Sequence, residues 1–399
     1  MKKIIIVHSN LEIGGAETSL IGLLQSIDYS RYEVDLLLLE KKGELLKFVP
    51  SQVNIIENKQ YSQLVIPIKK LIKSGNFTIA ISRLKGKLKA TYEHKIKKYN
   101  DLCYITKQYS YKNSMKFLDK LEKKYDLGIS FIDPHYILTE KINCNIKLGW
   151  IHTDFSRIDV NKKIDFEMWD KCDYIVSVSE ACKNGFDDKH PKLKQKSIVI
   201  ENLLSKEFIL EQSKAIDVSD EIQKSQKDSV NLLSIGRFSY AKNFDNIPQI
   251  CKNILEKGLD VEWYIVGYGG DEGLIQNKIE EFGVQKNVIL LGKKENPYPY
   301  IKACDIYVQP SRYEGKAVAV REAQILNKPV VITDFETSKS QLTDGFDGVI
   351  VPMDNEGCAE GICNLIKDKE LQQRLIENTK ITDYTNKQEL EKIYALLEG

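Results

Sequence analysis

Short runs of apolar residues, many of them β-branched, alternate along the chain with segments whose apolar residues recur at helical spacing. Several runs are apolar throughout, as strands are when helices cover both faces of a parallel sheet. The pattern therefore predicts an α/β fold built on parallel sheets. The strands predicted in the first half are 3–7, 34–39, 127–131, 148–151, 174–178 and 197–200. Those predicted in the second half are 231–235, 261–266, 288–291, 306–309, 330–333 and 349–351.

The alternation is interrupted at residues 205–229, which are polar and charged and have no clean period. We expect a linker with a short helix there, so the chain should form two α/β domains, residues 1–204 and 205–380. Its length of 399 residues fits two domains rather than one. The last segment, 381–399, is predicted to be a helix because four apolar residues recur at helical spacing. These are Leu390, Ile393, Tyr394 and Leu397.

Neither the cysteines nor the apolar runs indicate a secreted or membrane-spanning protein. The first apolar run is shorter than the roughly 7–15 residues of a signal-peptide core, and no run approaches the roughly 20 needed to span a bilayer. The eight cysteines form no C-x-x-C pair and lie mostly in apolar stretches, as reduced core thiols do. We therefore expect a cytoplasmic protein without a disulfide or zinc framework.

The net charge of +1 points to no class of partner, but the charge is unevenly distributed. Residues 59–124 hold 17 Lys or Arg and 4 Asp or Glu, a local excess of 13, so the rest of the chain carries −12. A Lys-rich helix with an apolar stripe suits an anionic membrane surface. We expect such an association for this stretch, where Leu84, Leu88 and Tyr92 share a helix face and Met115 and Leu118 similarly lie among lysines. A solvated face that packs on the domain through its apolar stripe is the alternative. Nucleic acid is not expected because no recognition motif or aromatic interleaving is present.

The most informative stretch for chemistry is 310–323, in which Glu314 and Glu322 have seven residues between them. If a helix begins near Lys316, Glu314 lies in the loop before it and Glu322 lies two turns inside it. The free N–H groups of a first helical turn can hold a diphosphate. Glu314 could accept hydrogen bonds from sugar hydroxyls and Glu322 from a ribose, although two solvated surface glutamates would have the same spacing. The residues expected around the helix start are Gly315, Lys316, Ala317 and Val318.

A second candidate is the end of the strand at 231–235, where Gly236 and Arg237 are followed by Lys242. An Arg fork and a Lys point charge can bind an anionic group such as a diphosphate and stabilise negative charge that develops on it. A strand-end Arg and a solvated Lys are the alternative on sequence alone.

Two candidates lie in the first half. Gly14 and Gly15 follow the first predicted strand and let backbone approach a ligand closely, although a tight turn would also use them. They do not form the G-x-G-x-x-G fingerprint of a dehydrogenase. His152 follows the strand at 148–151, at the edge of an open sheet where ligands bind, or is a buried structural histidine.

Residues 310–323 resemble the E-x₇-E signature of retaining family 4 glycosyltransferases of the GT-B fold. The preceding Gln309-Pro310-Ser311, the Gly236-Arg237 turn with its lysine, and the strand after Lys328-Pro329 are similar to that family's donor-sugar half. The resemblance spans most of the chain but is specific only at 230–352, and residues 60–125 match no pattern. It implies two facing Rossmann-like domains that enclose a nucleotide-sugar cleft, with the C-terminal helix returning to the first domain.

The resemblance also implies residue roles. Arg237 and Lys242 would contact the β-phosphate, Glu314 the sugar, and His152 the sugar or the acceptor. The loop with Gly14 and Gly15 would face the donor phosphates and the acceptor. Donor contacts are likewise expected at Gly236, at Gly292 beside the base, and at the helix start near Lys316.

The implied reaction is retaining transfer of a sugar, most often from a UDP-sugar, to a hydroxyl of a growing surface glycan, which can be polyprenyl-linked. No cofactor or metal is expected, because Arg237, Lys242 and a helix N-terminus would take the place of a cation. A sugar-nucleotide epimerase or phosphorylase of the same fold, and a non-catalytic sugar-nucleotide-binding protein, are the alternatives.

Overall fold

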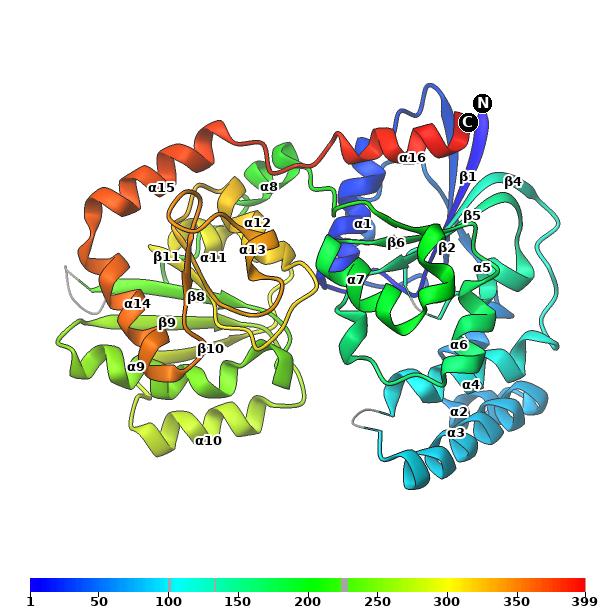
Figure 1. Cartoon of the computed structure of the whole chain (residues 1–399), viewed down its shortest axis with the longest axis horizontal. Coiled ribbons are helices and arrows are strands. Elements are labelled where there is room, and N and C mark those ends of the chain that lie inside the picture. Colours follow the sequence, from blue (N-terminus) through cyan, green and yellow to red (C-terminus); the bar gives the residue numbers. More distant parts are fainter. Residues whose placement is uncertain (100–101, 133, 224–228, 399) are drawn as a thin grey trace. The chain divides into compact units, whose positions relative to one another are not determined.

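Buried strands alternate with helices from Lys2 onward, as the apolar pattern predicts, and form two separate parallel sheets (Figure 1). The computed structural model describes residues 1–99, 102–132, 134–223 and 229–398. The chain divides into one unit of Met1–Leu203 with Lys387–Gly399 and a second unit of Leu204–Asn386. The division lies one residue before the boundary predicted from the sequence. The cleft expected between the domains stays a prediction.

Seven parallel strands form the sheet of the first unit. They are β1 (Lys2–His8), β2 (Tyr32–Leu38), β3 (Asn54–Glu57), β4 (Lys124–Ser130), β5 (Asn143–Ile151), β6 (Tyr174–Ser177) and β7 (Ser197–Val199). Their spatial order is β3-β2-β1-β4-β5-β6-β7. The order of the chain reverses between β1 and β4, and ligands of open parallel sheets bind at the carboxyl ends of the strands at such a point.

Helices cover both faces of this sheet. They are α1 (Gly15–Ser26), α2 (Ile68–Lys73), α3 (Phe77–Lys97), α4 (Cys103–Met115), α5 (Tyr136–Lys141), α6 (Lys162–Trp169), α7 (Glu180–Lys189) and α16 (Glu389–Glu398). Alternate residues of β1 pack into the cores on the two faces of the sheet. Ile4 and Ile6 lie on the side of α1, and Ile5 and Val7 lie on the other side. Burial on both faces explains why the strand sequence is apolar without alternation.

The second unit repeats this architecture with six parallel strands. They are β8 (Val230–Ile235), β9 (Val261–Val266), β10 (Val288–Gly292), β11 (Ile306–Gln309), β12 (Val330–Thr333) and β13 (Val349–Val351). The order is β10-β9-β8-β11-β12-β13, so the reversal lies between β8 and β11. Its helices are α8 (Lys206–Gln212), α9 (Ile247–Glu256), α10 (Glu272–Phe282), α11 (Tyr298–Ala303), α12 (Val318–Ile325), α13 (Ser338–Gln341), α14 (Asn355–Lys367) and α15 (Lys369–Ile381).

The C-terminal helix α16 belongs to the first unit, and Figure 1 shows this red helix beside the blue N-terminal elements. The Tyr394 ring stacks on Tyr32 with centroids 4.6 Å apart, and its hydroxyl accepts a hydrogen bond from the Asp28 N–H at 2.9 Å. At the other end of the helix, Glu389 accepts from the Glu201 N–H at 2.9 Å. The helix begins at Glu389, eight residues later than the predicted segment, because α15 continues to Ile381.

The predicted strands agree closely with the observed ones, except that β3 is absent from the prediction. Only Ile55 and Ile56 are apolar in that edge strand, between Asn54 and Glu57, so it lacks the apolar run of an inner strand. None of the helices in the described part of the chain combines the length and hydropathy that a bilayer-spanning segment needs.

Candidate active site

The carboxyl ends of β8, β11 and β12 meet at one edge of the second sheet and carry most of the predicted donor residues. Gly236 and Arg237 follow β8, the loop with Glu314 follows β11, and Thr333 ends β12. Because β8 and β11 are neighbours at the reversal of strand order, the loops after them lie where open parallel sheets bind their ligands.

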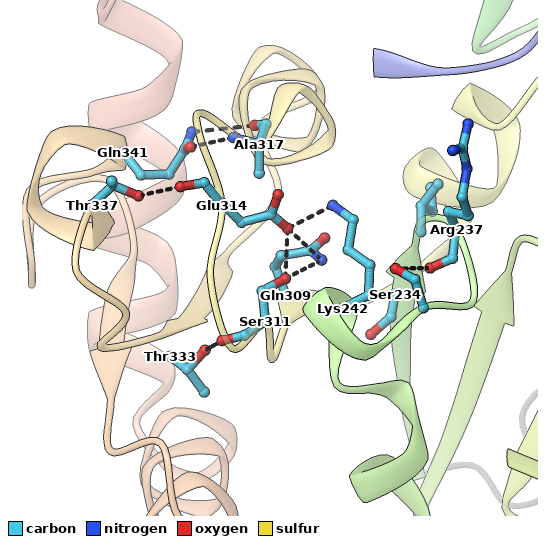
Figure 2. Close-up of polar contacts among 12 residues, drawn as sticks. Ser234, Arg237, Lys242, Gln309, Ser311, Glu314, Ala317, Thr333, Thr337 and Gln341 are labelled. Carbon is cyan, nitrogen blue, oxygen red and sulfur yellow. Dashed lines mark hydrogen bonds and ion pairs between the residues drawn. The ribbon is translucent and has the colours of Figure 1, made fainter. Parts of the chain in front are cut away.

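One carboxylate oxygen, Glu314 Oε1, accepts hydrogen bonds from three side chains at this edge. It accepts from the Lys242 ammonium at 2.5 Å, from the Ser311 hydroxyl at 2.6 Å and more weakly from the Gln309 amide at 3.4 Å. Figure 2 shows the three side chains converging on Glu314. Gln309 and Ser311 are fully buried, and the Tyr307 hydroxyl donates to Gln309 Oε1 at 2.7 Å, so the cluster is anchored in the core of the sheet.

Two further contacts join the loops after β8 and β11. Arg312 makes a bidentate pair with Asp245, with N···O distances of 2.9 and 2.7 Å. Asn243, at a left-handed φ of 61°, donates from its side chain to the Pro310 carbonyl at 2.9 Å. The two loops are thus fixed to each other without reliance on the Lys242–Glu314 ion pair, so their geometry is kept when a ligand competes for that pair.

The Lys242 side chain lies directly over Gly236. A Cβ at Gly236 would approach the Lys242 Cε and Cδ atoms to 3.1 and 3.2 Å, closer than nearly all real contacts. Gly236 therefore provides the space in which the lysine stem lies. One ammonium proton is directed at Glu314, which leaves two for an anion.

Arg237 is exposed, and its guanidinium points away from Lys242 in Figure 2. The sequence places both cations on the loop after β8, and the structure separates their heads. They present positive charge at two separate places of this edge, and their expected contact with the β-phosphate stays a prediction.

The helix after Glu314 begins at Val318, two residues later than predicted, with Ala317 as its N-cap. The Ala317 N–H donates to Gln341 Oε1 at 2.6 Å, and the Ala317 carbonyl accepts from the Gln341 amide at 3.2 Å. The Ala317 N–H is therefore bonded to a side chain in the described structure, and the donor contact expected at Ala317 stays a prediction. Gly315 and Lys316, expected in the first turn, precede the helix and are buried.

Glu322 lies inside α12 and is almost completely buried, at 4% exposure. Its Oε1 accepts from the Tyr298 hydroxyl at 3.0 Å. Burial penalises the carboxylate and raises the pKa of Glu322 to about 7, and the tyrosine bond offsets part of this rise. A buried carboxyl with one partner and spare acceptor capacity is suited to a pair of hydroxyl groups.

Gly292 ends β10 with φ of +70°, a left-handed conformation in which only glycine is unstrained. Its carbonyl accepts from the Gly267 N–H at 3.0 Å. At Gly267 a Cβ would lie 1.9 Å from the Gly236 carbonyl oxygen, so the turns after β8, β9 and β10 are packed backbone to backbone. These glycines shape the edge of the sheet on which the cations lie.

In the first unit, Gly14 is the N-cap of α1, Gly15 is its first residue, and a carboxylate covers them. A Cβ on Gly14 would lie 2.2 Å from Glu17 Oε2, and Glu17 Oε1 lies 3.1 Å from His8 Nε2. The glycine loop therefore faces an acidic side chain in the structure. Its expected contact with the donor phosphates stays a prediction.

His152 follows β5 and packs on Phe131, which follows β4, with ring centroids 4.4 Å apart. Phe131 also contacts His8 at the end of β1, at 6.0 Å. Burial, followed by the like charges of His8 and His135, lowers the pKa of His152 to about 3, so its imidazole is neutral at pH 7. Its buried Nε2 atom has no hydrogen-bond partner among the described residues.

A small pocket of about 80 Å³ lies at the same edge of the first sheet. Its polar lining comes from His8, Ser9 and Ser130 at the strand ends and from Lys107 and Tyr111 of α4. In the part of the chain that the structure describes, no group of three or more His, Cys, Asp and Glu side chains is arranged to hold a metal ion.

Several contacts of the site have no signal in the sequence. Gln309 and Ser311 belong to the stretch that carries the resemblance, but nothing there indicates that they bind Glu314. Tyr298 and Gln341 lie 24 residues from the groups they bind. Glu17 has the position of an ordinary helix-start acid. The polar character of Gln309 at the end of an inner parallel strand is the signal that could have identified it as a site residue.

Comparison with known proteins finds similarity to glycosyltransferases, most of it in the second unit. Residues 216–382 match the family described as glycosyl transferases group 1. An uncharacterized glycosyltransferase of Methanocaldococcus jannaschii is 29% identical over 214 residues, which cover 52% of this chain and 54% of that protein. The UDP-Gal:alpha-D-GlcNAc-diphosphoundecaprenol alpha-1,3-galactosyltransferase of Escherichia coli is 26% identical over 159 residues, 39% of this chain and 41% of the relative. The matches thus span about half the length of these relatives or less.

A crystal structure of a TarM mutant from S. aureus, in complex with Fondaparinux, alpha-GlcNAc-glycerol and UDP, has a similar fold. The TM-score is 0.71 with all of both chains covered, at 16% sequence identity. The two α/β units of this chain therefore have the GT-B fold, as predicted.

The raised pKa of Glu322 predicts a loss of stability as pH rises. The folded state keeps the proton between about pH 4.5 and 7, where the unfolded chain has lost it, so the free energy of unfolding should fall over this range by at most about 3 kcal/mol. Glu322→Gln keeps an acceptor for Tyr298 and should reduce that fall. Urea unfolding at pH 5 and pH 8 measures it, with exposed Glu256→Gln as control. Equal pH dependence in all three proteins would contradict the assignment.

The lowered pKa of His152 predicts that its imidazole does not titrate between pH 5 and 9. Histidine NMR of labelled protein, assigned with His152→Asn, measures this directly. A midpoint for His152 between pH 6 and 7 would show that it can act as an imidazolium, against the buried setting of its ring.

Proposed function

We propose that this chain, whose residues 216–382 match the group 1 glycosyltransferases, transfers a sugar from a UDP-sugar to a hydroxyl of a growing glycan, with retention of anomeric configuration. The observation that carries the proposal is the cluster at the carboxyl ends of β8 and β11. Lys242, Glu314 and Arg237 stand there at one edge, with Glu322 buried in the helix that follows.

The cluster supplies what breaking a sugar–diphosphate bond requires. The bond from the anomeric carbon to the diphosphate oxygen breaks, and negative charge develops on the leaving group. Arg237 and the two remaining protons of Lys242 stabilise this charge more in the transition state than in the bound donor. Glu314, held by Lys242 and Ser311, is oriented to accept from sugar hydroxyls.

Retention follows if the acceptor hydroxyl attacks the face from which the diphosphate leaves. A new bond forms between the anomeric carbon and the acceptor oxygen, and the acceptor proton passes to the departing diphosphate. No side-chain base is then needed. The neutral His152 would contact the sugar or acceptor as a hydrogen-bonding group rather than as an acid.

The choice of UDP and of a glycan acceptor rests on similar proteins. The TarM structure is in complex with UDP, and the Escherichia coli relative is named for transfer from UDP-Gal to a diphosphoundecaprenol-linked sugar. We extend these chemistries to this chain, placing it in surface polysaccharide synthesis with an acceptor that can be polyprenyl-linked. The excess of 13 positive charges in residues 59–124 would attract it to the anionic membrane that carries such an acceptor.

An epimerase or phosphorylase of the same fold would use the same donor cluster, but neither requires an acceptor glycan. Product analysis with and without acceptor therefore separates them from a transferase. A non-catalytic binding protein is disfavoured because Arg237, Lys242, Glu314 and Glu322 are all present.

Replacing Arg237 or Lys242 with alanine is expected to lower kcat by roughly 10²–10³, because each removes a preorganised donor to the leaving group. The exposed Lys252 of α9 provides the matched control, Lys252→Ala. Steady-state kinetics with donor and acceptor measure the effect. Near-normal turnover in Arg237→Ala and Lys242→Ala would remove both residues from the mechanism.

Turnover is expected to survive saturating EDTA with little change, because protein cations neutralise the diphosphate in this proposal. The assay is the same transfer reaction with and without chelator. Activity that EDTA abolishes and added Mg²⁺ or Mn²⁺ restores would show that a metal ion shares this role.

A further inference from the structure

Helix α3 is amphipathic in the reverse sense to an ordinary surface helix. Six of its large apolar side chains point to solvent, with exposed fractions from 47% for Leu84 to 66% for Tyr92. A surface helix normally buries its apolar stripe and exposes its polar face. The six side chains, which we call the α3 stripe, are Phe77, Ile81, Leu84, Leu88, Tyr92 and Ile96.

The residues of the α3 stripe are three or four apart, so they follow one face of the helix for its whole length. They account for six of the fifteen exposed large apolar residues among those the structure describes. Monomeric soluble proteins rarely expose a continuous apolar patch of this kind without a binding role.

The opposite face of α3 holds the helix in the first unit through the buried Ile79 and through small and polar residues. Ala80, Gly86 and Ala90 are buried, and a Cβ on Gly86 would lie 2.6 Å from the Ser110 N atom of α4. Arg83 donates to the Gln63 and Ile66 carbonyls, and Glu93 accepts from Asn161 at 3.0 Å. The helix is therefore attached to its unit without use of the stripe.

Lysines flank the stripe on both sides. Lys85 and Lys89 lie on one side of it and Lys87 on the other, and all three are exposed. Helix α2, which packs against α3, adds the exposed Ile72 and three exposed lysines, Lys69, Lys70 and Lys73. Residues 68–97 hold nine Lys or Arg and one Asp or Glu, a net charge of +8.

The second Lys-rich segment behaves differently. Met115 and Leu118, which the sequence also places among lysines, are buried in the core of the first unit. The apolar residues of that segment therefore pack on the domain, whereas those of α3 are exposed. Only α3 combines an exposed apolar stripe with flanking positive charge in the described part of residues 59–124.

We propose that α3 lies in the interface of an anionic bilayer, with the stripe among the acyl chains and the flanking lysines at the lipid phosphates. Charge complementarity selects this occupant. A second copy of the chain would bring two strongly basic helices together, which is unfavourable. This inference rests on the proposed function, because membrane binding would bring the protein to the lipid-linked acceptor proposed there.

The test uses sedimentation with vesicles of phosphatidylcholine containing about one third phosphatidylglycerol, without nucleotide sugar. The full-length protein should bind at low salt. Replacing Ile81, Leu84, Leu88 and Tyr92 with glutamine should weaken partitioning at least tenfold. A control with Ile216, Leu274 and Ile381 of the second unit replaced by glutamine removes equally exposed apolar side chains and should bind normally. A wild-type protein that stays in the supernatant would overturn the proposal.

Insertion is read separately with Tyr92→Trp. The native tryptophans Trp150, Trp169 and Trp263 are fully buried, so the added indole would be the exposed one. Its emission should move to the blue on anionic vesicles and be quenched by brominated lipid. An unchanged spectrum would show that the stripe does not enter the bilayer. Concentration-dependent dimers, lost in the four-residue variant, would instead identify the stripe as a self-association face.

Charge reversal at Lys85, Lys87 and Lys89 should weaken binding as added salt does, because interfacial attraction is screened over about 8 Å at physiological salt. The same variant should lose activity on a lipid-linked acceptor and keep it on a short soluble one. Vesicle binding needs no transfer, and soluble-acceptor turnover needs no membrane, so failure of this inference is distinguishable from failure of the proposed function.

Discussion

The donor half of the molecule depends on one constraint, the convergence of two loops on Glu314 Oε1 at the carboxyl ends of β8 and β11. Parallel strands put both loops at one edge, at the reversal of strand order where open sheets bind their ligands. The Arg312–Asp245 pair and the Asn243–Pro310 bond fix the loops independently. Lys242 can therefore be shared between a carboxylate and a phosphate without loss of the surrounding geometry.

The environments of the carboxyls and the histidine separate their roles. Glu314 is largely buried beside an ammonium group, whereas Glu322 is buried with one tyrosine partner and has a pKa raised to about 7. His152 lies among aromatic rings and two other histidines, which keeps it neutral. In the proposed reaction, the positive charge that the leaving diphosphate needs comes from Arg237 and Lys242.

The sequence predicts the fold well because strands buried on both faces have a strong local signal. The sequence-based prediction omits β3, whose end residues are polar. It also places the start of α12 two residues too early, because Gln341 binds the backbone of Ala317 from 24 residues away. Such long-range contacts have no local signature. For the same reason the sequence does not predict that Glu17 lies beside Gly14. Nor does it predict that the apolar stripe of α3 faces solvent, which depends on the close packing of Gly86 on α4. Lys242 and Glu314 can be predicted individually, but their ion pair cannot.

The most direct test of the central claim is calorimetric titration of the full-length protein with UDP and a panel of UDP-sugars. We predict binding at one site, weakened at least tenfold by Lys242→Ala and unchanged by Lys252→Ala, because only Lys242 lies at the edge formed by β8 and β11. A protein that binds no nucleoside diphosphate or nucleotide sugar, or that binds them equally well without Lys242, would contradict the role of this edge as the donor site.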